Sequence, residues 1–364
     1  GFLAEDGGFA RAVEAAGLTW IGPSPEAIEQ MGDKIRARNL VAAAGVPVSR
    51  GTPDPVADVE AAVKAMDDIG YPVMVKASAG GGGMGMAVAA DETALRTEFA
   101  RIQGFAERMF HDSSVLLEQF FPRVRHVEIQ VLGLADGRVI ALGERDCSVQ
   151  RRNQKLAEES PSPAVSPELR ERMYAAAVRA AEAVGYRNAG TVECLLDVES
   201  GEFVFLEMNT RLQVEHPVTE FVTGIDLVEA QLRIAAGEPV GFDPDSIAPV
   251  GHAIELPINA EDPIRFLPGP GAVSVWEEPS GEGVRVDSGY AAGCTVTPHY
   301  DSLMAKLIVH GADRDQALAR AREAVAGFRI EGPKCNLPFF AELLEHPEFC
   351  SGDYDTGIVT RMRS

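Results

Sequence analysis

Cysteine is scarce in this sequence, and long hydrophobic runs are missing. Only five of the 364 residues are cysteines, and no two of them form a Cys-x-x-Cys pair. The odd number argues against a disulfide framework, and the spacing argues against a zinc ribbon. We therefore expect a cytoplasmic protein. Because no apolar run approaches the length of a membrane span, we expect no membrane partner.

Basic residues are also in short supply. The 33 Lys and Arg residues are outnumbered by 55 Asp and Glu residues, which gives a net charge of −22. Nucleic-acid-binding proteins rely on basic surfaces, so this balance argues against DNA or RNA as a partner. Any anionic substrate must be held by a local basic pocket. The length indicates two or three structural units, and the alternating helical and strand-like runs indicate an α+β or α/β fold.

Glycine is concentrated in one loop. Residues 76–86 read Lys-Ala-Ser-Ala-Gly-Gly-Gly-Gly-Met-Gly-Met, between strand-like runs at 72–77 and 86–90. Four successive glycines let the backbone approach an anion closely, with N–H groups free to cradle phosphate. This is not a Walker loop, because Lys76 precedes the glycines and no Gly-Lys-Ser/Thr follows. A flexible hairpin tip is the alternative, but the neighbouring Lys76 favours phosphate.

A second segment, residues 207–216, reads Glu-Met-Asn-Thr-Arg-Leu-Gln-Val-Glu-His. If it is extended, one face carries two carboxylates, two amides and a guanidinium, from Glu207, Asn209, Arg211, Gln213 and Glu215. An ordinary amphipathic edge strand is the alternative interpretation.

A hairpin centred near Ser200 would set Glu193 opposite or diagonal to Glu207. Like charges across a sheet are destabilising, and a magnesium ion with oxygen ligands would remove that conflict. Otherwise one of the two glutamates is protonated or faces solvent.

Two further segments give expectations about cations and helices. Arg151, Arg152 and Lys155 lie within five residues, in a loop expected at 150–155. Cations at this density suit phosphate or bicarbonate, although salt bridges to the protein's own carboxylates are the alternative. Upstream, residues 24–44 read as one long helix that ends at Gly45.

Together these motifs resemble the biotin carboxylase family, the ATP-grasp component of acetyl-CoA, propionyl-CoA and pyruvate carboxylases. The resemblance runs through almost the whole chain, and its most specific segment is Glu207-Met-Asn-Thr-Arg-Leu-Gln-Val-Glu-His-Pro-Val-Thr-Glu220. Other segments that carry it are Met31-Gly32-Asp33-Lys34, Arg125-His126-Val127-Glu128-Ile129-Gln130, Glu144-Arg145-Asp146-Cys147-Ser148 and Ile258-Asn259-Ala260-Glu261-Asp262-Pro263.

The resemblance implies an ATP-grasp fold of the α+β class. Its expected units are a Rossmann-like remnant at 1–21, a helical linker at 22–47, a small β/α lid subdomain at 48–120, a larger mixed α/β core at 121–245 and a C-terminal biotin-carboxylase-type subdomain at 246–364. We expect the family's N-terminal strands and first helices, part of a Rossmann-like half-domain, to be absent ahead of Gly1.

The resemblance also implies three sets of site residues. ATP would be bound by Lys34, Lys76, Gly80, Gly81, Gly82, Gly83, Glu118, Gln119, Phe121, His126, Gln150, Asn153 and Leu195. Magnesium, or manganese in its place, would be held by Glu193, Glu207 and Asn209. Bicarbonate would be bound by Lys155, Arg211, Gln213, Val214 and Glu215. Lys155, Arg211 and Glu215 would be catalytic, with Glu215 as the general base, and a carboxylate beside a basic anion pocket is suited to taking a proton.

The implied chemistry is phosphoryl transfer. Bicarbonate would attack the γ-phosphate of ATP to give carboxyphosphate and ADP, and the carboxyl group would then pass to biotin on a carrier. The chain would need a biotin carboxyl carrier protein and a carboxyltransferase as partners. Arg285 resembles a position at the family's dimer interface, which implies a homodimer.

Three positions depart from the family pattern. Met84 stands where the glycine loop usually has Lys or Arg, and Asn153 stands where many members have His. Pro257 replaces an arginine thought to stabilise the biotin enolate and to position carboxyphosphate. Proline offers neither a side-chain donor nor an N–H group. Either activity is impaired, or another arginine serves. The competing hypotheses are an ATP-binding scaffold subunit and another ATP-grasp ligase that joins a carboxylate to an amine.

Overall fold

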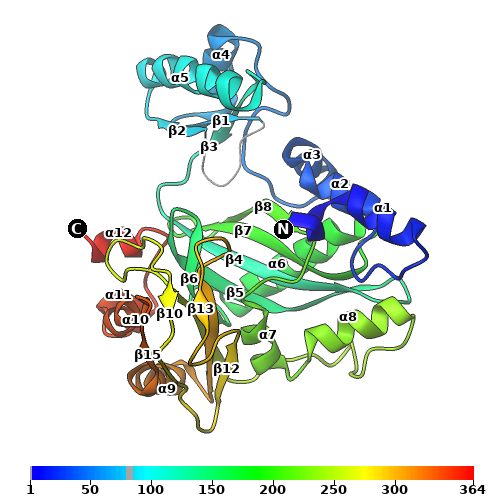
Figure 1. The fold of residues 1–364 in the computed structure, drawn as a ribbon. Helices are drawn as coiled ribbons and strands as arrows, with labels where there is room; N and C mark the ends of the chain where they lie inside the picture. Colours follow the sequence, from blue (N-terminus) through cyan, green and yellow to red (C-terminus); the bar gives the residue numbers. More distant parts are fainter. Residues whose placement is uncertain (1, 79–84) are drawn as a thin grey trace.

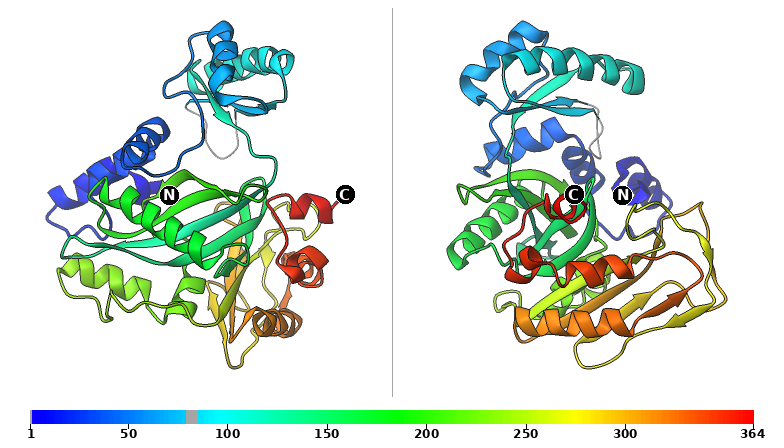
Figure 2. Two further views of the ribbon diagram at one scale, coloured as in Figure 1. Left: turned by 180° about the vertical axis from the view of Figure 1, so that it is seen from behind. Right: turned by 90° about the vertical axis from the view of Figure 1, so that its left-hand side faces the viewer.

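The computed structural model describes residues 2–78 and 85–364. Gly80, Gly81, Gly82, Gly83 and Met84 therefore lie outside the described residues. Figure 1 shows a small α/β unit set apart from a larger body, which is built on one curved sheet. The N-terminal helices and the C-terminal helices lie on different flanks of this body (Figure 2).

The larger body is organised by an eight-stranded antiparallel sheet. Its strand order is β12-β14-β9-β6-β5-β4-β7-β8. The strands are β4 (Val124–Gly133), β5 (Val139–Arg151), β6 (Gln154–Ser160), β7 (Asn188–Asp197), β8 (Phe203–Asn209), β9 (His252–Asn259), β12 (Val284–Ser288) and β14 (Leu303–Gly311). Strands from residues 124–209 and from residues 252–311 thus share one ladder, joined where β6 pairs with β9.

Helices cover the apolar sides of this sheet. The alanine-rich stripe of α6 (Pro167–Glu182) packs with Val127, Ile129 and Val131 of β4, because small side chains let the helix approach the sheet closely. Helices α7 (His216–Thr223) and α8 (Leu227–Ala236) follow β8 in the chain. This packing leaves the polar sides of β4 to β8 free to build a site.

The C-terminal region contributes aromatic residues to a core that it shares with the large sheet. It contains α9 (Arg314–Gly327), α10 (Leu337–Leu343), α11 (Pro347–Ser351), α12 (Ile358–Met362) and the short strands β10 (Gly271–Ala272), β11 (Val275–Glu277), β13 (Thr295–Val296) and β15 (Arg329–Glu331). Phe339, Phe340, Phe349 and Tyr354 are almost fully buried there. They pack with apolar residues of β9 and β14, so this region and the sheet share one core.

The small unit has an independent sheet and core. Strands β1 (Val73–Ala77), β2 (Met86–Ala89) and β3 (Val115–Gln119) form a three-stranded antiparallel sheet in the order β2-β1-β3. Helices α4 (Val59–Ile69) and α5 (Glu92–Phe110) pack on it around Val75, Leu95 and Phe99. The glycine-rich segment therefore connects the paired strands β1 and β2, as expected.

The single helix expected over 24–44 is wrong. After the 3-10 turn η1 (Phe2–Glu5) and helix α1 (Gly7–Ala15), the chain forms two helices, α2 (Pro25–Gly32) and α3 (Lys34–Ala43). Asp33 between them is extended, and its carboxylate accepts hydrogen bonds from the N–H groups of Ile35 and Arg36. This N-cap satisfies donors that a new helix leaves free, so it starts α3 and interrupts the periodic pattern.

The described part of the chain contains no helix that is both long enough and apolar enough to cross a membrane.

We predict that Gly133→Ala destabilises the protein. A β-carbon at Gly133, the last residue of β4, would lie 2.1 Å from the backbone oxygen of Tyr186, which cannot move away freely. The expected loss of unfolding free energy is at least about 1–3 kcal/mol, measured by urea denaturation. The control is Gly32→Ala, where no atom lies within 4 Å, and stability should change by no more than about 1 kcal/mol. If the two substitutions lower the free energy of unfolding equally, the close approach of Gly133 to the backbone of Tyr186 is contradicted.

Candidate active site

A cleft of about 740 Å³ opens between the small unit, the polar face of the large sheet and strand β9. It gathers most of the residues selected from the sequence. These are Lys34, Lys76, Glu118, His126, Gln150, Asn153, Lys155, Glu193, Leu195, Glu207, Asn209, Arg211, Gln213, Val214 and Glu215. Gln119 and Phe121 do not line this cleft, and the Gln119 side chain accepts a hydrogen bond from Arg50 instead.

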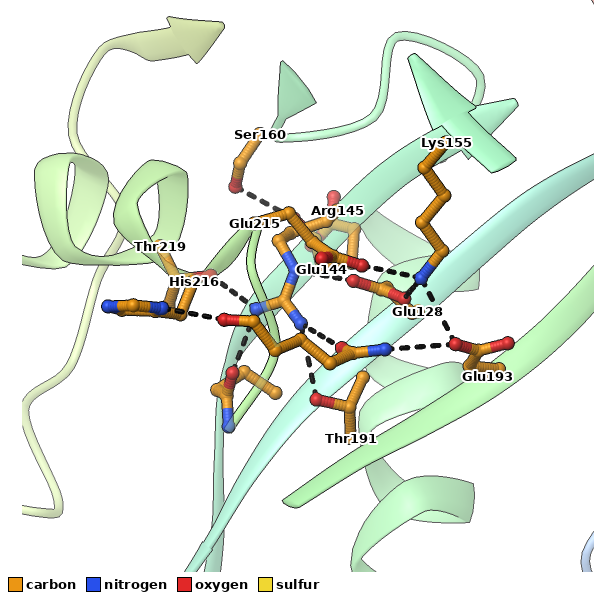
Figure 3. Close-up of polar contacts among 12 residues, drawn as sticks. Glu128, Glu144, Arg145, Lys155, Ser160, Thr191, Glu193, Glu215, His216 and Thr219 are labelled. Carbon is orange, nitrogen blue, oxygen red and sulfur yellow. Dashed lines mark hydrogen bonds and ion pairs between the residues drawn. The ribbon is translucent and has the colours of Figure 1, made fainter. Parts of the chain in front are cut away.

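Lys155 is the centre of the charged network in the cleft (Figure 3). Its Nζ lies 2.5 Å from Glu128 Oε2, 2.5 Å from Glu215 Oε1 and 3.0 Å from Glu193 Oε1. Burial works against the charge of this lysine, but the carboxylates outweigh it and hold the pKa of Lys155 well above its usual value. Lys155 therefore stays a cation and fixes three carboxylates from three different elements.

Arg145 lies beneath Lys155 and is fully buried. Its guanidinium donates to five acceptors, which lie on strands β4 and β7 and on the segment from β8 through α7: Glu128 Oε1 at 2.6 Å, Gln213 Oε1 at 2.7 Å, Gln130 Oε1 at 2.8 Å, Thr219 Oγ1 at 3.0 Å and Thr191 Oγ1 at 3.2 Å. A buried arginine is tolerated when its donors are satisfied in this way. The charges of Lys155 and Arg145 overcome burial and hold the pKa of Glu128 below its usual range.

The sequence analysis did not select Arg145 or Glu128 as site residues, although both lie in motifs that carry the family resemblance. Strand pairing could have revealed them, because Glu128 of β4 and Arg145 of β5 are direct cross-strand partners. Opposite charges in register on two apolar strands indicate a buried ion pair.

The predicted hairpin of β7 and β8 is confirmed, and Glu193 is paired in register with Glu207. Glu193 Oε1 accepts hydrogen bonds from Asn209 Nδ2 at 2.8 Å and Gln213 Nε2 at 2.9 Å. Although burial opposes ionisation, His126 and Lys155 lower the pKa of Glu193 to about 2, so this carboxylate is ionised. Glu207 is half-buried, and its Oε2 lies 3.5 Å from Lys34 Nζ.

This pair of carboxylates fits a divalent cation. Glu193 and Glu207 are oxygen donors on neighbouring strands, and both line the cleft together with Asn209. Magnesium in nucleotide sites is typically held by one or two carboxylates and by phosphate oxygens. The chemistry of this donor set therefore agrees with a magnesium site.

The extended segment expected over 207–216 is wrong in its second half. Strand β8 ends at Asn209, and α7 begins at His216 with Pro217 in its first turn. In the turn between them, Gln213 is drawn to Arg145 and Glu193, while Glu215 is drawn to Lys155. These buried polar contacts outweigh the tendency of the alternating pattern to stay extended. The selected side chains still meet in one cleft.

The basic loop expected at 150–155 is a tight hairpin. Strand β5 runs to Arg151 and β6 begins at Gln154, so only Arg152 and Asn153 form the turn, with φ values of 51° and 67°. The guanidinium of Arg151 lies over the ring of Phe266, 4.9 Å from its centroid, and Arg151 does not line the cleft. Arg152 does line it.

Pro257 lies in the wall of the cleft formed by β9. Its backbone oxygen accepts a hydrogen bond of 2.8 Å from the side chain of Asn336, which is fully buried. In the same region Glu255 of β9 is the cross-strand partner of Glu158 of β6. Both carboxyl groups are buried, and three of their four oxygens have no hydrogen-bond partner among the described residues.

Comparison with known proteins places this arrangement in a family. Residues 1–28 match the model for the biotin carboxylase N-terminal domain, residues 33–242 match that for the ATP-binding domain of the carbamoyl-phosphate synthase L chain, and residues 255–361 match that for the biotin carboxylase C-terminal domain. The chain is 49% identical over 360 residues to a biotin carboxylase of Halalkalibacterium halodurans, which covers 99% of this chain and 79% of that protein.

The chain belongs to the biotin carboxylase family.

Solved structures of biotin carboxylases agree with this assignment. A Campylobacter jejuni biotin carboxylase in complex with a β,γ-ATP compound matches with a TM-score of 0.93 and 42% identity, over 99% of this chain and 80% of that one. The biotin carboxylase domain dimer of Hydrogenobacter thermophilus 2-oxoglutarate carboxylase, with MgADP, ADP and bicarbonate, matches with a TM-score of 0.92 and 44% identity over the same shares. The predicted ATP-grasp fold is therefore confirmed, and the chain is an ATP-dependent ligase of the biotin carboxylase type.

We predict that Glu255→Gln stabilises this biotin carboxylase at neutral pH. Burial raises the pKa of Glu255 and Glu158 well above 4.5, so the folded state keeps protons that the unfolded state releases above about pH 4.5. The free energy of unfolding therefore falls as pH rises through that region. The glutamine variant should gain about 1–3 kcal/mol at pH 7, measured by urea denaturation, and the gain should vanish below pH 4.5.

Glu159→Gln is the control, and it is expected to change stability in the opposite direction. Glu159 is also buried, but hydrogen bonds from His252 and Arg314 more than offset burial and lower its pKa to about 2. Its contribution to stability is present above pH 4.5 and is lost as pH falls through about 2. Removing this charge should cost about 3–5 kcal/mol at pH 7. If Glu255→Gln and Glu159→Gln change the free energy of unfolding in the same direction at pH 7, the opposite pKa shifts inferred for these two carboxyl groups are wrong.

Proposed function

We propose that this biotin carboxylase uses the cleft to phosphorylate bicarbonate with Mg-ATP and to carboxylate biotin on a carrier protein. The observation that carries the proposal is the position of Glu215. Its carboxylate lies 2.5 Å from Lys155 Nζ, in the same cleft as Arg211 and the Glu193–Glu207 pair. A base beside cations suits an anionic substrate that must lose a proton.

ATP would lie between the small unit and the large sheet. Lys76 and Glu118 form an ion pair on β1 and β3, facing Lys34, His126 and Leu195 across the cleft. We propose that the lysines bind phosphate oxygens and that the segment 48–120 serves as a lid that excludes water. The separate sheet and core of this segment support the unit at 48–120, and we propose the further units at 1–21, 22–47, 121–245 and 246–364 on the family resemblance alone.

Glu193, Glu207 and Asn209 would hold the magnesium ion. When bound, such an ion neutralises charge that develops on the phosphates. Lys155 and the hydrogen bonds from Asn209 and Gln213 keep the Glu193 carboxylate ionised and oriented toward the cleft. The site would therefore be prepared before nucleotide binds.

Bicarbonate would be held at the junction of β8 and α7. Arg211 is oriented by Asn209 Oδ1 at 3.2 Å and by Glu5 Oε2 at 3.1 Å. Lys306 Nζ donates to the backbone oxygen of Val214 at 3.0 Å, which fixes the turn that carries Gln213 and Glu215. Glu215 would take the proton of bicarbonate while an oxygen of bicarbonate attacks the γ-phosphate. Lys155 would stabilise the negative charge that develops on bicarbonate.

The protein is of the kind found as a subunit or domain of biotin-dependent carboxylases. We propose that its partners are a biotin carboxyl carrier protein, a carboxyltransferase and a second copy of this chain. The homodimer proposal rests on Arg285, which lies at the surface of β12 beside Glu220 and Asp287. The five free cysteines support the proposed cytoplasmic setting.

Pro257 favours a second candidate function, an ATP-binding scaffold subunit of a carboxylase complex. Its side chain gives the β9 wall no hydrogen-bond donor. A scaffold would bind ATP without any bicarbonate-dependent turnover, which separates it from the enzyme. An ATP-grasp ligase of another specificity would instead release ADP only with its own carboxylate and amine.

We predict that Glu215→Gln lowers bicarbonate-dependent ADP release by about 10²–10⁴-fold, because it removes the base but keeps the shape of the side chain. The assay omits Mg-ATP, bicarbonate and free biotin in turn. The control is Glu229→Gln on the exposed surface of α8, which should retain the activity of the parent. If the rate of ADP release by the parent protein does not depend on bicarbonate, the carboxylase function is ruled out and the scaffold function is favoured.

A further inference from the structure

The cations that line the cleft are almost all committed to carboxylates. Lys34 lies 3.5 Å from Glu207, Lys76 is paired with Glu118, and Arg211 lies 3.1 Å from Glu5. Lys155 is surrounded by three glutamates. An anionic substrate must therefore compete with a carboxylate of the protein for each of these cations.

Arg152 is the exception in this cleft. Its side chain is exposed and lines the cavity, and no carboxylate of the described residues lies within ion-pair distance of it. The residues outside the description, 1 and 79–84, contain no acidic side chain. The Arg152 guanidinium can therefore bind an anion without first breaking an ion pair.

The turn that carries Arg152 is fixed on both sides. Before it, the Arg151 guanidinium stacks on Phe266, and after it, Gln154 Nε2 donates to Glu261 Oε1 at 3.2 Å. Ser302 Oγ also donates to Glu261 Oε1, at 2.6 Å. Arg152 itself has a φ of 51°, a left-handed conformation that is uncommon for a residue other than glycine. The structure thus holds an arginine in an unfavourable backbone conformation at the edge of the cleft.

The wall of the cleft formed by the C-terminal region supplies no competing cation. In the described part of the chain, its lining residues are Pro257, Asn259, Asp301, Leu303 and Thr356. Pro257 contributes no donor to the cavity, and Asp301 is an acid. Among the described residues that line this cleft, Arg152 is therefore the arginine or lysine that offers an anion near this wall a positive charge not paired with a carboxylate.

We propose that Arg152 binds the anionic intermediate of the reaction, the phosphorylated bicarbonate, and so fills the role that Pro257 cannot. The inference rests on the proposed function. A guanidinium is planar and can donate two parallel hydrogen bonds to a carboxylate or a phosphate. Arg152 would hold the intermediate while its carboxyl group is transferred to biotin.

The test compares Arg152→Gln with Arg329→Gln in the full chain. Arg152→Gln should lower biotin-dependent ADP release by about 10²-fold, as expected for the loss of one charge-stabilising donor. Arg152→Lys should retain part of the activity. Arg329→Gln removes an exposed arginine of β15, which pairs with Glu277 and Glu331 and does not line the cleft, and should change the rate by less than about threefold. A rate for Arg152→Gln within threefold of the parent would overturn the proposal.

A second-site variant makes the test specific. Pro257→Arg should raise the rate of the Arg152→Gln variant at least about tenfold but change that of the parent much less, since both arginines would serve one anion. Independent effects of the two substitutions would contradict a shared role. Melting temperatures identify any variant that loses activity through misfolding of the turn.

A binding measurement separates this inference from the proposed function. Phosphonoformate joins a carboxylate directly to a phosphonate and resembles the intermediate, so its affinity in the presence of Mg-ADP can be measured by calorimetry without turnover. Arg152→Gln should weaken binding at least tenfold, and Arg329→Gln should not. If the parent releases no ADP with bicarbonate, the proposed function fails, yet the binding result still decides whether Arg152 is an anion site. Equal affinity of parent and Arg152→Gln would exclude it.

Discussion

The hydrogen-bonded contact between Arg145 and Glu128 is the interaction on which the rest of the site depends. Both side chains are fully buried between β4 and β5, where an unpaired charge would be very unfavourable. The second oxygen of Glu128 binds Lys155, so the buried arginine indirectly fixes the lysine at the floor of the cleft. Lys155 in turn binds Glu193 and Glu215, so the positions of these two carboxylates depend on the pair.

The same arginine also links the sheet to the segment between β8 and α7. Its bonds to Gln213 and Thr219 hold a stretch of chain that has no strand pairing of its own. Glu215 lies between these two residues and is thereby placed against Lys155. The position of the proposed base thus follows from satisfying the donors of one buried guanidinium.

Sequence reasoning predicted the ATP-grasp fold, the β7–β8 hairpin and most residues of the cleft. The turn sequence near Ser200 predicted the hairpin, whereas the resemblance to the biotin carboxylase family implied the fold and the site residues. It failed where side-chain contacts, local or distant, decide the backbone. The break at Asp33 depends on a cap, and the end of β8 at Asn209 depends on contacts of Gln213 with Arg145 and Glu193. The partners of Arg145 come from positions up to 74 residues away, so no local pattern could assemble them.

The pairing of β6 with β9 has a consequence for how such a site can change through evolution. Because both strands belong to one ladder, backbone hydrogen bonds set the distance between the wall that carries Lys155 and the wall that carries Pro257. A side chain lost from one wall leaves the other wall in place and at a fixed spacing. Substitutions can then replace a functional side chain on one strand by a similar side chain on the other strand. The cavity keeps its dimensions as long as the ladder itself is preserved.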